Sequence, residues 1–409
     1  MKQKNKFLTI ISTTCVFLNI FFASPYIFAA DSLNADMHQD FEKWKKDFKE
    51  TALSQGVRKS NLNKVLSEVK LLKNVLDSDK KQSEFLLSFW DYTTRTLSES
   101  RIKKGREILK QNQAFLKSME EKYKVPSSYL VAFWGLETNY GLFKGNIKTF
   151  DALATLSFDK RRRSFFTREF ITLLKLMDQG ETTKFYGSWA GAFGNFQFMP
   201  TTYAAYAVDA DGDGKKDVIN SLPDAFSSAA NYLSKMGWKQ EEPWGREVSF
   251  QKKVDWNKIS KHSTRKVSEW GKLGIKPILS ISEKEKDFEA KLIMPMGYNG
   301  PKFLVYSNFD RILRWNNSVL YALSVGLLSD MLQDKNFKLY AKQKNEKISI
   351  KDIERIQVLL SQKGFYEGKA DGILGKDTRK SIQIDQKRKG LPQDGYPSVQ
   401  LIKKLTKEK

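Results

Sequence analysis

The chain has 409 residues, which is enough for two or three domains. Hydrophobic residues make up 40% of it and aromatic residues 13%, so most of the chain can bury a core, and extensive disorder is excluded. The formal net charge is +23, from 70 Lys and Arg against 47 Asp and Glu. Such an excess predicts an anionic partner or surface. Charge alone leaves three readings open: nucleic acid, an anionic cell envelope, and an ordinary solvated basic surface.

The first thirty residues have the layout of a secretory signal peptide. Three lysines lie within the first six residues, residues 7–22 are mostly apolar, and Ala29-Ala30 precede the first polar segment. Phe28 stands where a small residue is preferred before the cleavage site, so an uncleaved membrane anchor remains an alternative. We therefore expect residues 1–30 to direct export to the periplasm or cell envelope.

Cysteine and histidine are too rare to build several kinds of catalytic site. Cys15 lies inside the apolar stretch after polar residues, so we do not expect a lipoprotein. The chain after residue 30 has no cysteine, which excludes disulfides and Cys-ligated zinc. With only His38 and His262, neither a His-rich metal site nor a Ser-His-Asp triad is expected. Catalysis should therefore use carboxylates, hydroxyls and amides.

The first half of the remaining chain is predicted to be helical. Residues 31–125 show apolar positions three and four residues apart and contain little glycine. Residues 126–240 continue as helices but include glycine-containing loops, where binding and catalytic residues concentrate.

The region from 241 to 300 differs from its surroundings. Short segments such as Val248–Phe250 and Lys291–Met294 indicate strands, so we expect a small mixed subdomain there. Helical periodicity returns from Asn308 to Leu332.

The C-terminal part is predicted to be a separate domain. Residues 336–348 are rich in Lys and Asn and are interpreted as a linker. Residues 349–409 contain two Asp-Gly turns, at Asp371-Gly372 and Asp394-Gly395. This pattern predicts short helices joined by tight turns.

Glu137 is the strongest candidate for acid-base chemistry. A helix start at Pro126 is followed by residues 130–136, which are apolar on nearly every face, and Gly141 closes the helix. Burial raises the pKa of a carboxyl group, and the negative end of the helix dipole raises it further. The segment thus favours a carboxyl that is protonated near neutral pH, as a general acid requires. A Glu paired with a basic residue, or one that reaches solvent, is the alternative.

A second cluster runs from Ser188 to Pro200. Its small residues allow the backbone to approach a ligand closely, and its aromatic residues can stack on sugar rings. The side chains of Ser188, Asn195 and Gln197 can bond hydroxyl and acetamido groups. A glycine-rich turn that only packs helices together is the alternative.

An acidic loop follows at residues 209–224. Asp occupies positions one, three, five and nine of an EF-hand pattern, with Gly at position six, but Asn220 replaces the closing Glu at position twelve. Asp224 could supply the missing carboxylate from a longer loop. The residues expected around an ion are Asp209, Asp211, Asp213, Lys215, Asp217 and Asp224. We expect a structural calcium ion without a catalytic role, against the alternative of an Asx-rich surface turn.

Together these segments resemble the lytic murein transglycosylase B family over roughly residues 40–335. The similar stretches are Trp134–Gly141, Ser188–Pro200, Ala229–Leu233, Phe303–Tyr306 and Arg314–Asn316 with Tyr321. The resemblance implies a mainly α, lysozyme-like catalytic core for residues 31–335 and a calcium-binding loop at the acidic segment.

The same resemblance implies roles for single residues. Glu137 matches the sole catalytic acid and base, and Ser188 and Gln197 match residues that contact the substrate. Asn316 and Tyr321 match residues that line the cleft near the reacting sugar. Trp315 stands where some relatives have another aromatic residue.

The implied activity is that of a peptidoglycan lyase. It cleaves the β-1,4 bond between N-acetylmuramic acid and N-acetylglucosamine without water and leaves 1,6-anhydro-N-acetylmuramic acid ends. A hydrolytic muramidase is the nearest alternative and would want a second carboxylate, for example Asp151 or Asp159. A catalytically inactive peptidoglycan-binding scaffold is the other.

Residues 349–409 resemble the small three-helix peptidoglycan-binding domain found at the ends of many cell-wall hydrolases. A tethered binding module would raise the effective concentration of an enzyme at an insoluble substrate. A helical cap that merely folds is the alternative. The expected partner is the peptidoglycan glycan strand and not nucleic acid. Association with the envelope stays open, the chain is expected to act as a monomer, and no cofactor is expected in catalysis.

Overall fold

A computed structural model describes residues 35–81, 87–181, 184–252, 254–259, 263–342 and 348–407. The predicted signal peptide, His262 and part of the predicted linker lie outside these residues. Across the described ranges, every helix is too short or too polar to cross a membrane.

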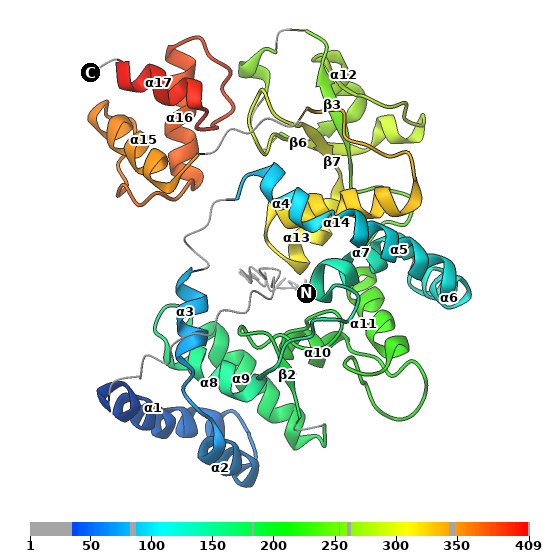
Figure 1. Ribbon diagram of the computed structural model, residues 1–409, viewed down its shortest axis with the longest axis vertical. Coiled ribbons are helices and arrows are strands. Elements are labelled where there is room, and N and C mark those ends of the chain that lie inside the picture. The colour runs from blue at the N-terminus through cyan, green and yellow to red at the C-terminus, as the bar shows by residue number, and fades with distance from the viewer. Residues whose placement is uncertain are drawn as a thin grey trace, which may run out of the picture.

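Helices dominate the fold, as predicted, and form two groups stacked along the long axis (Figure 1). The lower group comprises α1 (Ala35–Ser54), α2 (Lys59–Glu68), α3 (Lys73–Lys81), α8 (Thr149–Phe158), α9 (Arg163–Asp178) and α10 (Pro200–Tyr206). The central group comprises α4 (Phe89–Thr96), α5 (Glu99–Gln111), α6 (Gln113–Tyr123), α7 (Ser127–Thr138), α11 (Leu222–Lys235), α13 (Ser307–Trp315) and α14 (Val319–Gln333). One hydrophobic core runs through both groups, from Phe41 on α1 to Leu332 on α14.

Helices α7 and α14 form the middle of the central group. Both are apolar and buried on nearly every face, which is why neither shows a one-sided hydrophobic stripe. Small residues let the two helices approach closely, and the Ser128 and Ser329 hydroxyls share a hydrogen bond of 2.8 Å. The Trp244 ring covers Gly326, where an added Cβ would lie 2.3 Å from the ring.

A five-stranded antiparallel sheet forms the predicted mixed subdomain, here called the sheet unit. Its strand order is β4-β6-β7-β3-β5. The elements are β3 (Gly245–Phe250), η1 (Trp256–Lys258), β4 (Arg265–Lys266), α12 (Val267–Lys272), β5 (Ile275–Pro277), η2 (Lys284–Asp287), β6 (Glu289–Ile293) and β7 (Phe303–Val305). The sheet unit has its own core around Trp270 and Tyr306. Strands β3 and β6 confirm the two predicted strand segments.

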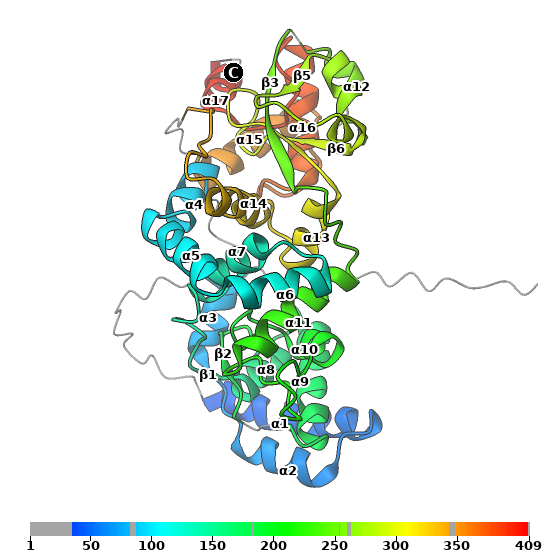
Figure 2. The ribbon, with the colours of Figure 1, turned by 90° about the vertical axis from the view of Figure 1, so that its right-hand side faces the viewer.

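A short two-stranded sheet was not predicted from the sequence. Strand β1 (Ile147–Lys148) pairs antiparallel with β2 (Tyr186–Gly187) next to α8 (Figure 2). Two residues are too few to show an alternating pattern.

Three helices close the chain, as predicted: α15 (Ile350–Gln362), α16 (Lys376–Arg388) and α17 (Val399–Lys407). They share a separate small core and lie at the same end of the molecule as the sheet unit in both views (Figures 1 and 2). The backbone N–H of Tyr298, in the sheet unit, donates to Oδ2 of Asp394 at 2.7 Å. The N–H groups of Tyr340 and Ala341, in the predicted linker, donate to the Glu247 carboxylate of β3 at 2.8 and 2.7 Å. The C-terminal domain therefore contacts the sheet unit through Asp394, and the described part of the linker contacts it through Glu247.

Candidate active site

Glu137 lies in the last turn of α7, and an unusual turn fixes its position. Asn139, Tyr140 and Gly141 all have positive φ angles, of 49°, 61° and 82°. Such angles are rare for residues other than glycine, so the surrounding structure must hold them in place. The Tyr140 ring does so, because it lies 2.8 Å from the position that a Cβ on Gly135 would take. Its hydroxyl donates to the carbonyl of Arg101 at 2.8 Å.

The Glu137 carboxyl group receives two hydrogen bonds on one oxygen. The Tyr321 hydroxyl donates to Oε1 at 2.5 Å, and the Trp315 indole N–H donates to the same atom at 2.9 Å. Within the described residues, no hydrogen bond reaches Oε2. The two oxygens are thus distinct, and Oε2 remains available to carry a proton.

The environment of Glu137 raises its pKa from 4.5 to about 7. Burial is the largest cause, and the hydrogen bonds from Tyr321 and Trp315 lower the pKa only in part. The carboxyl group is therefore substantially protonated near neutral pH. This agrees with the raised pKa predicted from the apolar helix.

Aromatic packing holds the indole of Trp315 in place. Its ring centroid lies 4.6 Å from that of Phe133, 5.5 Å from Phe198 and 5.1 Å from Tyr232. The sequence left the role of Trp315 open, and the structure places it in direct contact with Glu137.

Tyr92 on α4 is a neighbour of Glu137 that sequence reasoning missed. Burial raises the pKa of its hydroxyl most, the charge of Glu137 raises it further, and Arg101 lowers it. Tyr92 belongs to none of the segments that carry the family resemblance, so its proximity became visible only in the fold.

Ser188 and Gln197 come from one glycine-rich loop. The Ser188 hydroxyl accepts the Ala192 N–H at 3.2 Å. Gln197 has φ +49°, and its Nε2 donates to the carbonyls of Lys144 and Gly194 at 3.0 Å each. These bonds use both hydrogens of the amide and leave Oε1 as an acceptor for a ligand.

Asn195 differs from its neighbours because its hydrogen-bonding groups are used inside the protein. Its Oδ1 accepts the Trp134 indole N–H, and its Nδ2 donates to the carbonyls of Val218 and Ile219. The side chain that sequence reasoning proposed for sugar binding thus holds the loop to the protein interior instead.

Asn316 ends α13, next to Trp315. Its side chain is 4% exposed, and Oδ1 is buried without a hydrogen-bond partner in the described part of the chain. Such an acceptor costs roughly 1–3 kcal/mol. This unpaired acceptor lies one residue along the chain from Trp315, which contacts Glu137.

The two carboxylates considered for a hydrolase are engaged elsewhere. Asp151 accepts the backbone N–H of Lys70, and Asp159 accepts from the backbone and side chain of Arg161. In the described structure, neither carboxylate is hydrogen-bonded to Glu137 or to Tyr321 and Trp315, which hold it.

Asp209, Asp211 and Asp213 form the acidic cluster of the loop. These exposed side chains each place a carboxylate oxygen within 4.8 Å of the others. Hard oxygen donors at this spacing fit a divalent cation such as calcium. The backbone N–H groups of Gly212 and Gly214 bond to Asp209 and fold the loop around the cluster.

Asp217 and Asp224 are arranged differently from the other three acids. The fully buried Asp224 accepts the backbone N–H groups of Ala210 and Asp217 at 2.7 and 2.8 Å. Asp217 accepts from Ile219 and from both the backbone and the side chain of Asn220. Neither belongs to the described cluster. In this structure Asp224 closes the loop by binding its backbone.

Comparison with known proteins agrees with this arrangement. A membrane-bound lytic murein transglycosylase B of Escherichia coli is 30% identical over 283 residues, which are 66% of this chain and 77% of that protein. SltB3 from Pseudomonas aeruginosa, solved with NAG-anhNAM-pentapeptide, has a TM-score of 0.84 and 35% identity over 90% of this chain and all of that one. Slt35 of Escherichia coli, solved with calcium, has a TM-score of 0.60 and 27% identity over 71% of this chain and 92% of that one.

Two family descriptions account for most of the sequence. The C-terminal match, over residues 349–405, is to a putative peptidoglycan binding domain. The larger match covers residues 40–330, and by it the protein belongs to the transglycosylase SLT domain family.

Proposed function

We propose that the protein is a lytic transglycosylase that cleaves the bond between N-acetylmuramic acid and N-acetylglucosamine in peptidoglycan. One observation carries the proposal: Glu137 is a single carboxyl group with a pKa of about 7, held by two donors on Oε1 and by none on Oε2 in the described structure. A reaction that uses one group first as acid and then as base needs no second carboxylate.

The reaction begins with proton transfer from Oε2 of Glu137 to the glycosidic oxygen. The bond from that oxygen to C1 of the muramyl sugar breaks, and its electron pair leaves with the N-acetylglucosamine. The C6 hydroxyl of the same muramyl sugar then attacks C1 while the Glu137 carboxylate takes its proton. The product is a 1,6-anhydro ring, and Glu137 ends in its starting protonated form. During the intermediate step, Tyr321 and Trp315 stabilise the carboxylate through Oε1.

The acceptors around the site would hold the sugar that reacts. Oε1 of Gln197 and the unpartnered Oδ1 of Asn316 can each accept an N–H or O–H group. An acetamido N–H held by one of them would turn the acetamido oxygen towards C1, where positive charge develops. Ser188 completes this set, because its hydroxyl accepts from the backbone and still has a hydrogen to donate.

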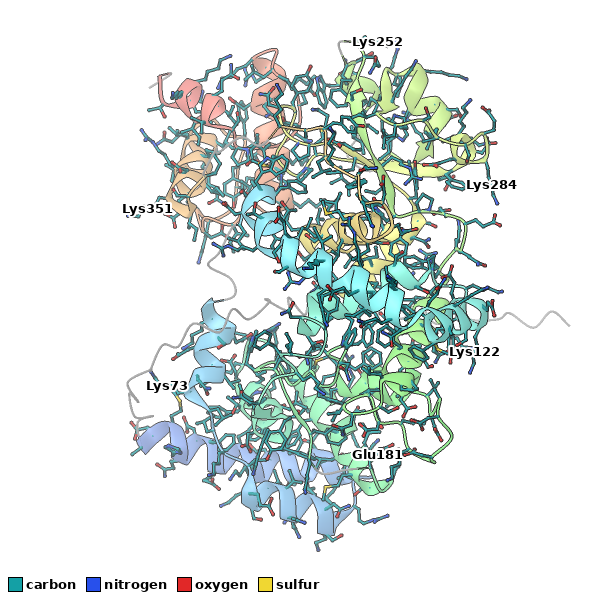
Figure 3. All side chains as sticks on the ribbon, turned by 45° about the vertical axis from the view of Figure 1, so that its right-hand side comes forward. Lys73, Lys122, Glu181, Lys252, Lys284 and Lys351 are labelled. Atoms are coloured by element: carbon teal, nitrogen blue, oxygen red, sulfur yellow. The ribbon has the colours of Figure 1, made fainter. Side chains whose placement is uncertain are left out.

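The remaining features support work at the cell envelope. Figure 3 shows basic side chains at the edge of several parts of the molecule, including Lys73, Lys122, Lys252, Lys284 and Lys351. A basic exterior favours binding to an anionic wall. Export through residues 1–30 and action as a monomer are part of the proposal. So is a structural calcium ion at Asp209, Asp211 and Asp213, where the carboxylate spacing supports it.

Mass spectrometry of the products from purified peptidoglycan tests the function. The unaltered chain should release muropeptides that end in 1,6-anhydro-N-acetylmuramic acid, and Glu137→Gln should release none. Products one water heavier, with reducing ends, would identify a hydrolase instead. If the unaltered chain binds the wall but releases no product, the protein is a catalytically inactive peptidoglycan-binding scaffold.

A further inference from the structure

The C-terminal domain contains the same turn twice. The first turn is Asp371-Gly372-Ile373, which is hydrogen-bonded to Gln357 of α15. The second turn is Asp394-Gly395-Tyr396, which is hydrogen-bonded to Gln386 of α16. In each, the glutamine Nε2 donates to Oδ1 of the aspartate, at 2.8 and 2.7 Å. In each, the glycine N–H donates to the glutamine Oε1 at 2.9 Å.

Further details of the two turns agree. The N–H after each glycine donates to Oδ1 of its aspartate, at 2.9 Å in the first turn and 2.8 Å in the second. Both glycines have positive φ angles, of 70° and 66°. The helix residues that face them also correspond, since Ile350 and Glu354 precede Gln357 by the same intervals as Arg379 and Gln383 precede Gln386. The turns are therefore structural copies.

The second turn binds a piece of backbone. Oδ2 of Asp394 accepts the N–H of Tyr298 at 2.7 Å, and Tyr396 is buried against the same segment of the sheet unit. The residue before that N–H is Gly297, with φ +69°. A Cβ on it would lie 2.7 Å from both Oδ2 of Asp394 and Cβ of Tyr396. The second turn thus accepts a residue with positive φ and excludes an L side chain.

The first turn presents the same groups to solvent. Oδ2 of Asp371 has no hydrogen-bond partner among the described residues, and Ile373, which corresponds to Tyr396, is 52% exposed. The hydrogen bond from Gln357 lowers the pKa of Asp371, so the carboxylate is charged. Asp394 has Arg379 nearby, whereas the corresponding residue beside Asp371 is the uncharged Ile350. The Asp371 carboxylate is therefore a charged acceptor for an N–H group, and its negative charge is not offset by an arginine at the position of Ile350.

We propose that the first turn binds the stem peptide of peptidoglycan, by accepting a backbone N–H next to a D-amino acid. The inference rests on the proposed function, which places the chain on peptidoglycan, whose stem peptides contain D-residues. A D-residue adopts positive φ without strain, as glycine does, and its side chain points away from the position that is closed to an L-residue. Asp371 and Ile373 would then contact the peptide as Asp394 and Tyr396 contact residues 297 and 298.

The test measures binding of a sugar-free stem tetrapeptide, released from peptidoglycan by an amidase, to the full chain by calorimetry. Asp371→Asn keeps the Oδ1 acceptor of the turn and replaces the outward acceptor with a donor, so it should weaken binding by at least about tenfold. Ile373→Ser provides a second variant that leaves Asp371 intact, and it should also weaken binding. Asp377→Asn and Val358→Ser are matched controls, since both residues are exposed in the same domain. They should stay within about twofold of the unaltered chain.

Stereochemistry provides an independent readout. An all-L peptide of the same sequence should bind at least about tenfold more weakly than the natural one. Equal binding of the two peptides would overturn the proposal, as would equal losses in Asp371→Asn and Asp377→Asn, or no binding by the unaltered chain. Anhydro products from the same preparations separate this result from the enzymatic function. If anhydro products form but Asp371→Asn leaves peptide binding unchanged, only the peptide site is refuted.

Discussion

The hydroxyl of Tyr321 lies 2.5 Å from Oε1 of Glu137, and this contact opposes the effect of burial. A hydrogen bond donated to a carboxylate favours its charged form, whereas burial favours its neutral form. The pKa of about 7 is the balance of these effects, with burial the stronger. The same carboxyl group can therefore hold a proton at rest and still be stable as an anion during the reaction.

Tyr321→Phe should shift the pH dependence of catalysis. Loss of the donor raises the pKa of Glu137 above about 7. Because the protonated form starts the reaction, activity is lost as pH rises through this pKa. The alkaline limb of kcat/KM should therefore move up by about one pH unit, with a lower maximum. Tyr232→Phe is the control, because the Tyr232 hydroxyl donates to the backbone carbonyl of Arg314 and not to Glu137. An alkaline limb that stays in place or moves down in Tyr321→Phe would contradict this account.

Asn316→Ala and Asn195→Ala should have opposite effects on activity and stability. Oδ1 of Asn316 has no partner to lose among the described residues, so the free energy of unfolding should change by less than about 1 kcal/mol. The value of kcat/KM should fall at least about tenfold, because the site loses an acceptor for a group of the substrate. Asn195→Ala breaks three side-chain hydrogen bonds, two of them fully buried, and should cost about 2–4 kcal/mol of stability. Urea denaturation of both variants, followed by kinetics on soluble glycan, separates the two roles. Equal destabilisation would argue against a ligand-binding role for Asn316.

Calcium should raise the melting temperature through the acidic loop. At a concentration about 100-fold above Kd, binding to the folded state alone adds roughly 2.7 kcal/mol. Asp213→Asn keeps the acceptor for the Lys215 N–H but replaces the charged carboxylate with a neutral amide, so it should abolish this gain without lowering the melting temperature in a chelator. Asp224→Asn should lower the melting temperature in calcium and chelator alike, because it loses a buried bond to the loop backbone. If calcium leaves the melting temperature of the unaltered chain unchanged, the acidic loop does not bind the ion.

Gly297→Ala should detach the C-terminal domain from the sheet unit. The new Cβ would lie 2.7 Å from Asp394 and Tyr396, and neither the turn nor the strained φ of +69° can absorb it easily. Limited proteolysis should then release the C-terminal helices faster, and small-angle scattering should report a larger radius of gyration. Gly364→Ala is the matched control, since its φ is +72° but its Cβ would meet no atom within 4 Å. Both variants carry the strain of about 1–2 kcal/mol, and only the first should change the shape.

Local features of the sequence predicted much of the fold. A helix that is apolar on every face predicted the burial of Glu137, and the two Asp-Gly pairs predicted the turns of the C-terminal domain. These signals work because they depend on neighbours within a few residues.

Contacts between distant parts of the chain could not be predicted in this way. Tyr321 and Trp315 are 184 and 178 residues from Glu137, and they reach it only because α14 packs against α7 and α13 packs against α14. The difference between Asn195 and Asn316 has the same origin. Both residues are amides beside aromatic residues. Backbone carbonyls more than twenty residues away accept hydrogen bonds from Asn195, whereas Oδ1 of Asn316 has no partner among the described residues.

The contacts of the linker and of the second turn with the sheet unit have a mechanical consequence. Glu247 and the segment that ends at Tyr298 both belong to the sheet unit, so these contacts join the linker and the terminal domain to that unit. A tilt of the upper half relative to the lower half would carry the domain along as one lever. The sheet unit in turn meets the active-site helices where Trp244, the residue before β3, covers Gly326 of α14, the helix that carries Tyr321.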